Sequence, residues 1–318
     1  MKTSNESNKV YTVIVTYNSM KWIKECLDSV IIESTVVVVD NLSTDQTVSF
    51  IKENYDGVVV LEQQTNLGFG KGNNLGIDYA LENYADYVLL LNQDAKLELG
   101  SIGKLVQFAK NNSNYGIISP IHCDWSGQFL ESSFSKYVNY KANKEFYSDF
   151  VLNKSLKPIY DVPFIAAACW FMSKEAILAI GGFDPIFFHL GEDVNYAQRL
   201  TYHGYKIGVL PNINVYHDTK DRVYPHLRTY SEDYFYRFNY RNKIIYADLN
   251  LKNWKIKLNY NKRQVLKEVL ASLLTLRYSN LRGAFKQYKE FGKIREQCEK
   301  SRAINKEKGS HYLNYKVK

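Results

Sequence analysis

Residues 11–41 read YTVIVTYNSMKWIKECLDSVIIESTVVVVDN, and this stretch decides the class of fold. YTVIVTY (11–17) and TVVVVDN (35–41) are runs rich in β-branched residues that suit strands buried on both faces. Between them, apolar residues recur on one side of a helix that Asn18 or Ser19 can cap. A strand, a helix and a strand in this order predict a parallel sheet covered by helices.

The same alternation continues along the chain. We expect a second helix over 43–55 with Ser43 as its cap, a strand in GVVVLEQ (57–63), a helix over 77–84 and a strand in DYVLLLNQD (86–94). A helix is expected near 101–111, followed by strand and loop sequence to about 160. Residues 163–218 predict further strands, a short helix capped by Ser173, a loop that ends in Glu192 and Asp193, and a helix that follows it to Tyr202. The fold class is therefore α/β, with a Rossmann-like, mostly parallel sheet.

Polar residues gather where the predicted strands end. Thr16, Asn18, Asp40, Asn41 and Asp94 all fall at or just after the carboxyl ends of strands. In open α/β sheets, ligands bind beyond these ends. This edge is the first candidate for a functional site.

The glycine-rich stretch NLGFGKGNNLG (66–76) has two interpretations. No GK[ST] follows it, and the turn after the first strand has no glycine, so a P-loop and a dinucleotide-binding fingerprint are both disfavoured. The glycines can let the backbone approach a ligand, or they can form a surface turn.

Three acidic residues and one histidine are candidates for chemistry. Asp94 can bind a hard divalent cation such as Mg²⁺ or Mn²⁺, or it can cap the next segment. His217, after the strand-like INVY, can be a second ligand or a structural residue. Glu192 and Asp193 can be favoured simply by a helix N-terminus. In an apolar cleft, however, a carboxylate of this pair would have a raised pKa and would act as a general base.

Eight stretches, in order, resemble family 2 glycosyltransferases, and bacterial rhamnosyltransferases among them. They are VTYN (15–18), VVDNLSTDQT (38–47), NLGFGKGNNLG (66–76), LLLNQDA (89–95), GGFDPIFF (181–188), GED (191–193), RLTYHGYKIGVLP (199–211) and VYHD (215–218). The resemblance covers residues 10 to about 220. It implies a GT-A fold, with a nucleotide-sugar-binding half over about 10–96 and an acceptor-binding half over 97–250.

The resemblance also assigns expected roles to the candidate residues. Asp193, with Glu192 beside it, would be the catalytic base of an inverting transfer, and Asp94 and His217 would hold Mg²⁺ or Mn²⁺. The expected donor-binding residues are Thr16, Asn18, Asp40, Asn41, Gly68, Asn73 and Asn92. Asn92 replaces the usual first acidic residue of the metal motif, so metal binding should be weak or dispensable. Asn195 replaces an acidic residue often found two positions after the base.

The expected reaction is transfer of a sugar, rhamnose from dTDP-rhamnose, to a saccharide or lipid-linked saccharide in bacterial surface polysaccharide synthesis. A family 2 transferase that uses a UDP-sugar is the alternative. A sugar nucleotidyltransferase should have a basic, glycine-rich loop after its first strand, and VTYNSMK lacks one. A protein that binds nucleic acid through a basic tail is the alternative of another class, but it leaves the acidic motifs unexplained.

Charge is distributed unevenly along the 318 residues. Residues 1–250 carry a net charge of −5 and residues 251–318 carry +13. Within this tail, QVLKEVLASLLTLRYSNLRGAF (264–285) predicts one basic amphipathic helix, which can lie on an anionic leaflet or pack on protein as a cover or an oligomer interface. We therefore expect a catalytic domain over 1–250 and a helical tail over 251–318.

The cysteine content and the hydropathy of the sequence indicate where in the cell the protein is expected. Four scattered cysteines form no CxxC pattern, which argues against a zinc module and a disulfide framework. The polar N-terminus lacks the apolar stretch of a signal peptide, and the longest apolar run, 162–172, is too short to span a bilayer. We expect a cytoplasmic protein, peripheral at the inner face of the cell membrane.

Overall fold

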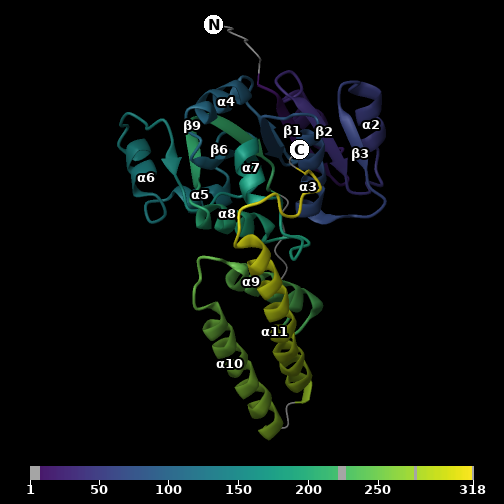
Figure 1. Cartoon of the computed structure of the whole chain (residues 1–318), viewed down its shortest axis with the longest axis vertical. Coiled ribbons are helices and arrows are strands. Elements are labelled where there is room, and N and C mark those ends of the chain that lie inside the picture. The colour runs from purple at the N-terminus through teal and green to yellow at the C-terminus, as the bar shows by residue number, and fades with distance from the viewer. Residues whose placement is uncertain (1–7, 221–226, 276–277, 317–318) are drawn as a thin grey trace.

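The computed structural model describes residues 8–220, 227–275 and 278–316. Over these residues a nine-stranded sheet has the order β3-β2-β1-β4-β8-β6-β9-β5, with β7 beside β9 (Figure 1). The strands are β1 (Val10–Thr16), β2 (Thr35–Asp40), β3 (Val59–Glu62), β4 (Tyr87–Leu91), β5 (Ala95–Leu97), β6 (Tyr115–Asp124), β7 (Tyr160–Asp161), β8 (Cys169–Ser173) and β9 (Lys206–His217).

The first half of the sheet is parallel, as the sequence predicts. β1 lies between β2 and β4, β3 pairs with β2, and all three pairs are parallel. β8 then runs antiparallel to β4 and β6, while β6 and β9 pair in parallel. The α/β class is confirmed, and the antiparallel β8 joins the two parallel parts.

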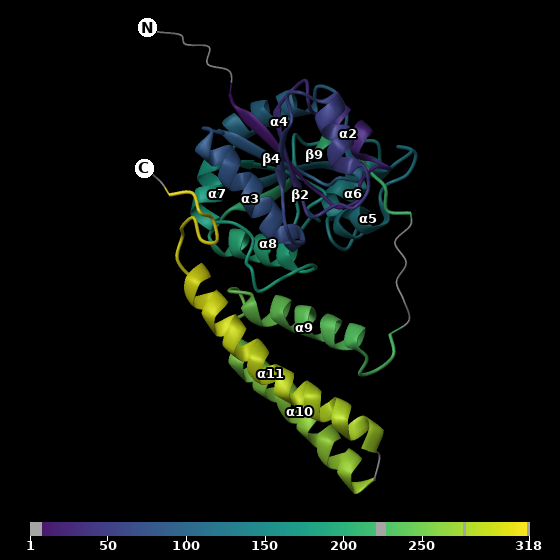
Figure 2. The same ribbon diagram turned by 90° about the vertical axis from the view of Figure 1, so that its right-hand side faces the viewer.

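Helices cover both faces of this sheet (Figures 1 and 2). Those of the body are α1 (Ile23–Asp28), α2 (Thr47–Asn54), α3 (Gly68–Glu82), α4 (Ser101–Lys110), α5 (Ser132–Val138), α6 (Lys144–Val151), α7 (Lys174–Ile180) and α8 (Glu192–Tyr202). Alternate residues of β1 face opposite sides: Ile14 belongs to a core cluster with residues of α1, α2 and α4, and Val13 belongs to another with residues of α3, α7 and α8. Both faces are therefore buried, which explains the continuous apolar strands.

The glycine-rich stretch is mainly helical. We expected a loop followed by a helix over 77–84, but α3 already begins at Gly68. A Cβ on Gly76 would lie 2.3 Å from Val13 Cγ1, and one on Gly72 would lie 3.0 Å from Val15 Cγ1. The glycines thus allow α3 to lie directly on β1, and this close packing outweighs their low helix propensity.

Of the predicted helix caps, Ser173 is confirmed, whereas those at the first two helices are wrong. Ser173 caps α7 by accepting a hydrogen bond from the Ala176 N–H (3.2 Å), as expected. Neither Asn18 nor Ser19 gives α1 a side-chain cap, since α1 begins only at Ile23. Ser43 is also not a cap: α2 begins at Thr47, and the Ser43 hydroxyl instead donates to Asp40.

The region we expected to be strand and loop after residue 111 contains two helices. The helix near 101–111 is confirmed as α4, but α5 and α6 were not predicted. Each is short and buries a phenylalanine, Phe134 or Phe146, in the core. Glu131 caps α5 and Asn143 caps α6. With one or two buried positions each, these helices give no clear period in the sequence.

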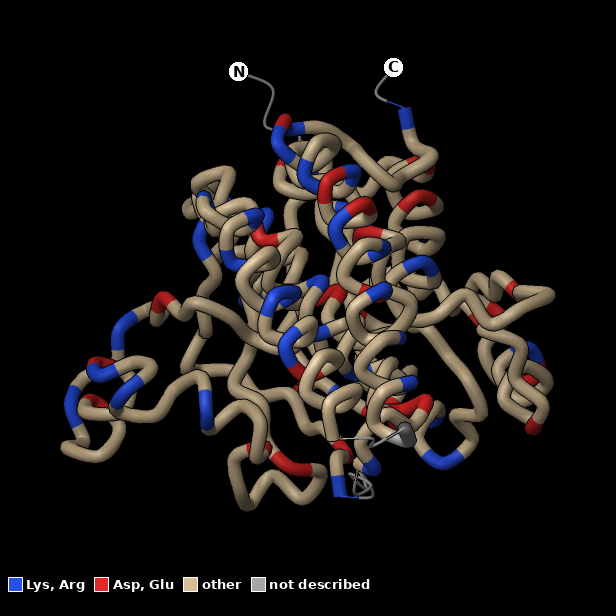
Figure 3. Tube along the Cα trace, turned by 90° about the horizontal axis from the view of Figure 1, so that it is seen from below, with Lys and Arg blue, Asp and Glu red and all other residues tan. Residues whose placement is uncertain are grey.

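Three helices follow the body: α9 (Glu232–Ala247), α10 (Trp254–Leu274) and α11 (Tyr278–Asn305). They pack around Tyr246, Leu258 and Phe291, and α10 and α11 extend away from the body as a hairpin (Figures 1 and 2). The single helix expected over 264–285 is wrong, because α10 ends at Leu274. Viewed from below, lysines and arginines outnumber acidic residues on these helices (Figure 3).

The end of α11 returns to the body at a buried carboxylate. Asp184, only 1% exposed, accepts hydrogen bonds from Ser301 Oγ (2.6 Å), Asn305 Nδ2 (3.0 Å) and Tyr312 OH (3.1 Å). The N–H groups of Asn314 and Tyr315 then donate to Asp78 on α3 (3.0 and 2.9 Å). The C-terminal segment is therefore held to the body by two carboxylates.

We predict that Tyr312→Phe lowers the free energy of unfolding by about 1.5 kcal/mol or more, because it removes one hydrogen bond to a buried charge. Chemical denaturation of the full chain measures the change. Tyr260→Phe is the control, since Tyr260 is 61% exposed on α10 and should cost less than about 0.5 kcal/mol. Equal stability of Tyr312→Phe and the wild type would contradict the importance of this contact.

Candidate functional site

The carboxyl ends of β1 and β2 are joined by side-chain hydrogen bonds. Thr16 pairs with Asp40 in the sheet, and its hydroxyl donates to Asp40 Oδ1 (2.8 Å). The Ser43 N–H and hydroxyl also donate to Asp40, at 2.8 and 2.5 Å. Asp40 is 3% exposed, so its carboxylate mainly shapes the edge of the sheet. Its predicted contact with a nucleoside stays a prediction.

Asn18 supports the same edge from the next loop. It has a positive φ of 50°, which asparagine tolerates better than most residues. Its side-chain oxygen accepts from the Thr44 N–H (2.8 Å), and its own N–H donates to Ser43 Oγ (2.9 Å). Asn18 therefore holds two loops together, and it is not part of the lining of the two cavities described below.

A cavity of about 630 Å³ opens at this edge. It contains five of the predicted residues, Thr16, Asn41, Gly68, Asn92 and Asp94. The other residues that line it were given no donor-binding or metal-binding role in the sequence analysis; they are Val15, Tyr17, Asn66, Phe69, Gln93, Phe188, His189 and Tyr236. Several of these are aromatic or amide side chains, which suit a flat ring with polar edges.

Gly68 and Asn73, both expected near the donor, have different environments. Gly68 has φ +78°, and a Cβ there would lie 2.1 Å from the Phe188 carbonyl oxygen, so only glycine fits. Asn41 fixes this turn by donating to Gly68 O and accepting from Leu67 N–H, both at 3.2 Å. Asn73 is 2% exposed and donates to Phe69 O within α3, away from the cavity.

Asp94 and His217 come together from distant parts of the chain. β5 and β9 pair so that Ala95 lies opposite His217. Asp94 Oδ1 then lies 3.2 Å from His217 Nε2. Two neighbouring ligands of one cation with bonds of about 2.1 Å are about 3 Å apart. These two residues therefore fit a divalent metal with one oxygen and one nitrogen ligand.

A second cavity, of about 720 Å³, adjoins the first and shares Phe69, Asn92 and His189 with it. The acidic pair Glu192 and Asp193 opens into this cavity together with His217. The remaining lining residues are Ala166, Ala167, Ala168, Leu190, Gly191, Arg237, Tyr240 and Arg241. The two cavities thus form one continuous site over the sheet edge.

The two acidic residues differ in exposure. Glu192 is only 4% exposed, whereas Asp193 is partly exposed to the cavity. Burial and, to a lesser extent, the negative charge of Glu192 together raise the pKa of Asp193 to about 6. Burial also raises the pKa of Glu192. Asp193 has the access and the basicity that the base role needs.

Helix α9 adds two arginines that sequence reasoning did not select. Arg237 and Arg241 are one helical turn apart and line the cavity of Asp193. Within the described part of the chain, neither guanidinium forms a hydrogen bond or an ion pair. Their spacing of four residues was the available signal, but they lie beyond the stretches that resemble a known family. Two such cations fit an anionic ligand.

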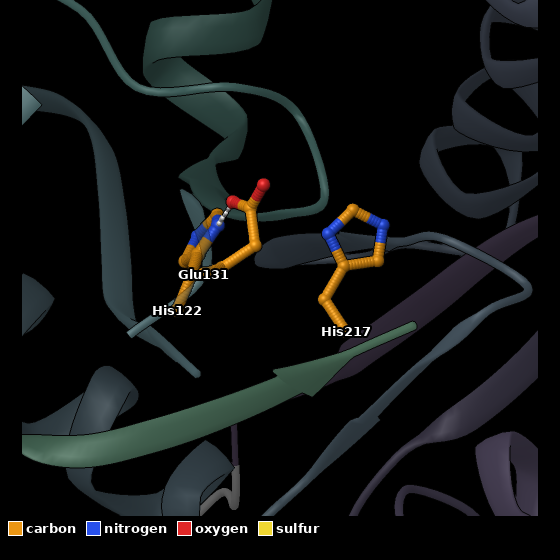
Figure 4. Close-up of side chains that lie close together, drawn as sticks. All are labelled: His122, Glu131 and His217. Atoms are coloured by element: carbon orange, nitrogen blue, oxygen red, sulfur yellow. Dashed lines mark ion pairs between the residues drawn. The ribbon is translucent and has the colours of Figure 1, made fainter. Parts of the chain in front are cut away.

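Behind His217 lies a buried group of His122, Glu131 and His217 (Figure 4). One ligand atom from each lies within 4.8 Å of the others, so the group can also be considered for a metal. Burial, with a contribution from nearby His217, lowers the pKa of His122 to about 3. His122 is therefore neutral at physiological pH.

Comparisons with known proteins identify the family of this chain. The family model for glycosyl transferase family 2 matches residues 11–181, and the chain belongs to this family. A dTDP-rhamnosyl transferase of Shigella flexneri is 24% identical over 68% of this chain and 71% of its own. An N-acetylglucosaminyl-diphospho-decaprenol L-rhamnosyltransferase of Mycobacterium tuberculosis is 25% identical over 64% and 74%. The expected likeness to rhamnosyltransferases is confirmed.

Similarity to solved structures of other proteins identifies the fold. S. aureus TarS 1-349 in complex with UDP-GlcNAc has a TM-score of 0.53 at 16% identity, over 92% of both chains. GalNAc-T7 with UDP, GalNAc and Mn²⁺ has a TM-score of 0.54 at 14% identity, over 76% of this chain. The match spans about half the length of GalNAc-T7. These neighbours have the GT-A fold, so the predicted fold is confirmed.

We predict that Glu192→Gln lowers the pKa of Asp193 from about 6 toward, but not to, its ordinary value of 3.8. The substitution removes a neighbouring negative charge, which stabilises the ionised form of Asp193, while burial remains. A carboxyl ¹³C titration of Asp193 measures the shift. An unchanged or higher pKa in the variant would rule out coupling between the two carboxylates.

Proposed function

We propose that this protein is an inverting glycosyltransferase that moves a sugar from a nucleoside diphosphate to an acceptor hydroxyl. One observation carries the proposal: Asp193 opens into the same cavity as Asn92 and His217. A base and the expected diphosphate-binding edge thus face one space. The aromatic and amide lining of the adjoining cavity supports binding of the nucleoside there.

The proposed chemistry needs one base and one stabilised leaving group. Asp193 takes the proton of the acceptor hydroxyl as that oxygen attacks the anomeric carbon. The bond from this carbon to the diphosphate oxygen breaks, and its electron pair leaves with the diphosphate. Attack from the face opposite the leaving group inverts the anomeric configuration. A pKa of about 6 keeps Asp193 ionised at neutral pH and still basic enough to accept the proton.

The charge of the leaving diphosphate has two proposed partners. Asp94 and His217 would hold Mg²⁺ or Mn²⁺, which supplies positive charge to phosphate oxygens when bound. Arg237 and Arg241 would contribute two guanidinium groups from the other side of the cavity. Because Asn92 stands where the resemblance implies a carboxylate, we propose that the arginines carry part of the role that a stronger metal site would have.

For the donor we propose dTDP-rhamnose, and for the acceptor a saccharide or lipid-linked saccharide of a bacterial surface polysaccharide. The Shigella and Mycobacterium relatives support rhamnose. The TarS complex with UDP-GlcNAc supports a UDP-sugar as the second candidate. Nucleotide release measured across a panel of dTDP- and UDP-sugars distinguishes them, since only the true donor should give acceptor-dependent release.

We predict that Asp193→Asn lowers turnover about 10²- to 10⁴-fold while donor binding stays close to wild type. The substitution removes the proton acceptor and nearly conserves size. Stopped-time product assays give the turnover, and calorimetry gives the donor affinity. Asp56→Asn, an exposed position outside both cavities, is the control. Near wild-type turnover in a folded Asp193→Asn protein would exclude Asp193 as the base.

The proposed role of the arginines predicts a change in nucleotide binding, in contrast to the change in turnover expected for Asp193. Arg241→Gln should weaken binding of the nucleoside diphosphate, most clearly in EDTA, because it removes a cation that no metal then replaces. Arg263→Gln, on an exposed position of α10, is the matched control. If Arg241→Gln leaves nucleotide affinity unchanged with and without EDTA, the arginines do not bind the diphosphate.

We also propose that the hairpin of α10 and α11 attaches the protein to the inner face of the cell membrane, with 1–250 as the catalytic part. Val265 and Val269 of α10 are buried, while Leu266, Leu270, Leu273 and Leu274 of the same helix are 39 to 86% exposed. The basic residues of α10 are Lys255, Lys257, Lys262, Arg263 and Lys267. Within the described residues, no helix has the length and apolarity to cross a bilayer.

We predict that vesicles rich in acidic lipid recover the full-length protein and that neutral vesicles recover it poorly. Each basic residue near an anionic surface contributes about 1 kcal/mol, and salt should weaken the attachment without abolishing it. Leu270→Asn with Leu274→Asn should reduce recovery, because it removes apolar insertion. Leu99→Asn is the control, as Leu99 is 71% exposed on the body.

Point variants serve this test better than removal of the tail. Deleting residues 251–318 would also remove Ser301, Asn305 and Tyr312, which bind the buried carboxylate of Asp184. Equal recovery on acidic and neutral vesicles, or no recovery on either, would mean that the exposed leucines contact protein.

A further inference from the structure

Glu131 is a buried carboxylate beside the proposed metal ligand. It is 3% exposed, and among the described residues no lysine or arginine forms an ion pair with it. Its neighbours are His122, at 0% exposure, and His217, at 3% (Figure 4). A buried charge is usually balanced by a partner. The two histidines are the candidates for that partner.

The hydrogen-bond pattern excludes His122 as a donor to Glu131. The Ser119 hydroxyl donates its one hydrogen to Cys169 O (2.7 Å), so Ser119 can only accept from His122 Nε2 (2.9 Å). A neutral His122 then carries no hydrogen on Nδ1. This Nδ1 lies 3.9 Å from Glu131 Oε2 and has no hydrogen-bond partner in the described part of the chain. Two acceptors therefore face each other, and neither satisfies the other.

His217 is placed to relieve this arrangement. Its Nε2 lies 3.2 Å from Asp94 Oδ1, on the side of the proposed metal. Its other ring nitrogen is on the side of Glu131 and His122 (Figure 4). A neutral imidazole has one N–H, and it binds a cation only through the nitrogen without the hydrogen. A hydrogen on Nδ1 would thus free Nε2 for the metal and point toward the carboxylate.

We propose that Glu131 is a positioning residue that holds the ring hydrogen of His217 on Nδ1 and leaves Nε2 free for a divalent cation at Asp94. This inference rests on the proposed function, which places the cation there. A spacing of up to 4.8 Å allows the hydrogen bond to form through a small rotation or one bridging water. His122, itself fixed by Ser119, closes the other side of Glu131 and supplies no competing hydrogen.

This role gives the site a carboxylate in place of the one missing at position 92. A carboxylate behind a metal-binding histidine orients the ring and makes its free nitrogen a better ligand. The negative charge of Glu131 therefore acts on the cation through His217, while Asn92 contributes none directly. The charge lies behind the ring, out of contact with the diphosphate.

The test compares Mn²⁺ binding to the full chain in Glu131→Gln and wild type, with free Mn²⁺ followed by its EPR signal. Glutamine keeps the oxygen that accepts from the Ser133 N–H at the start of α5, and its amide can donate to His122 Nδ1, so the variant should fold. We expect the Mn²⁺ dissociation constant to rise about 10- to 100-fold. Glu33→Gln should leave it unchanged, since Glu33 accepts from the Gly100 and Gly103 N–H groups far from the metal site.

Ring ¹⁵N shifts of His217 in metal-free protein provide a second measurement that does not depend on Mn²⁺ binding, with His217→Gln for assignment. We expect a larger share of the Nδ1–H form in the wild type than in Glu131→Gln, because Asp94, 3.2 Å from Nε2, is then the carboxylate left to accept the ring hydrogen. Wild-type Mn²⁺ affinity in Glu131→Gln, or the same share of the two forms in both proteins, would overturn the inference while leaving the proposed function intact.

Asp94→Ala separates the remaining outcomes. Loss of Mn²⁺ binding in this variant supports the proposed position of the cation. If Asp94→Ala still binds Mn²⁺ and Glu131→Gln does not, the cation lies within the buried group itself and the positioning role is wrong. If the wild type binds no Mn²⁺, the metal part of the proposed function fails and the inference fails with it.

Discussion

The buried carboxylate of Asp184 holds the C-terminal helices to the loop that leads into the acidic pair. Its donors come from α11 and the segment after it, and its other oxygen accepts from the Ile186 N–H (3.0 Å). Lys243 of α9 in turn donates to the Ile186 carbonyl (2.9 Å). Because a buried charge without donors is costly, these contacts make this loop, α9 and α11 stabilise one another. Arg237 and Arg241 are thereby held beside Asp193.

The sequence predicted the features that depend on the hydrophobic pattern of strands and helices and on the position of the carboxyl ends of the strands. The parallel strands, the helix at Glu192 and the gathering of Thr16, Asn41 and Asp94 at one edge follow from runs of β-branched residues and the topology of α/β sheets. It could not predict that α3 begins at Gly68, because the close approach to Val13 is a property of the tertiary structure. For the same reason it could not predict that the side chains of Asn18 and Asn73 form hydrogen bonds within the protein and are not part of the lining of the two cavities.

The site concentrates acidic groups at one edge of the sheet, although the proposed donor is itself anionic. Asp94, Asp193, Glu192 and Glu131 all lie near the two cavities or just behind them. Asparagine at positions 92 and 195 lowers the negative charge at that edge. Buried Asn195 instead accepts from Arg199 (3.1 Å), whose guanidinium also donates to the Gly182 carbonyl. The neutral residue is thus built into the support of the loop before Asp193.

The C-terminal third has two separate basic regions. The arginines of α9 face the cavities, whereas the lysines and arginines of α10 and α11 surround a hairpin that extends away from the body (Figure 2). α9 packs against that hairpin through Phe238 and Phe291 and also lines both cavities through Tyr236 and Arg237. The cavities therefore open on the side of the body that carries the hairpin. If the hairpin lies on a leaflet, as proposed, an acceptor anchored in that leaflet would approach Asp193 from the membrane side.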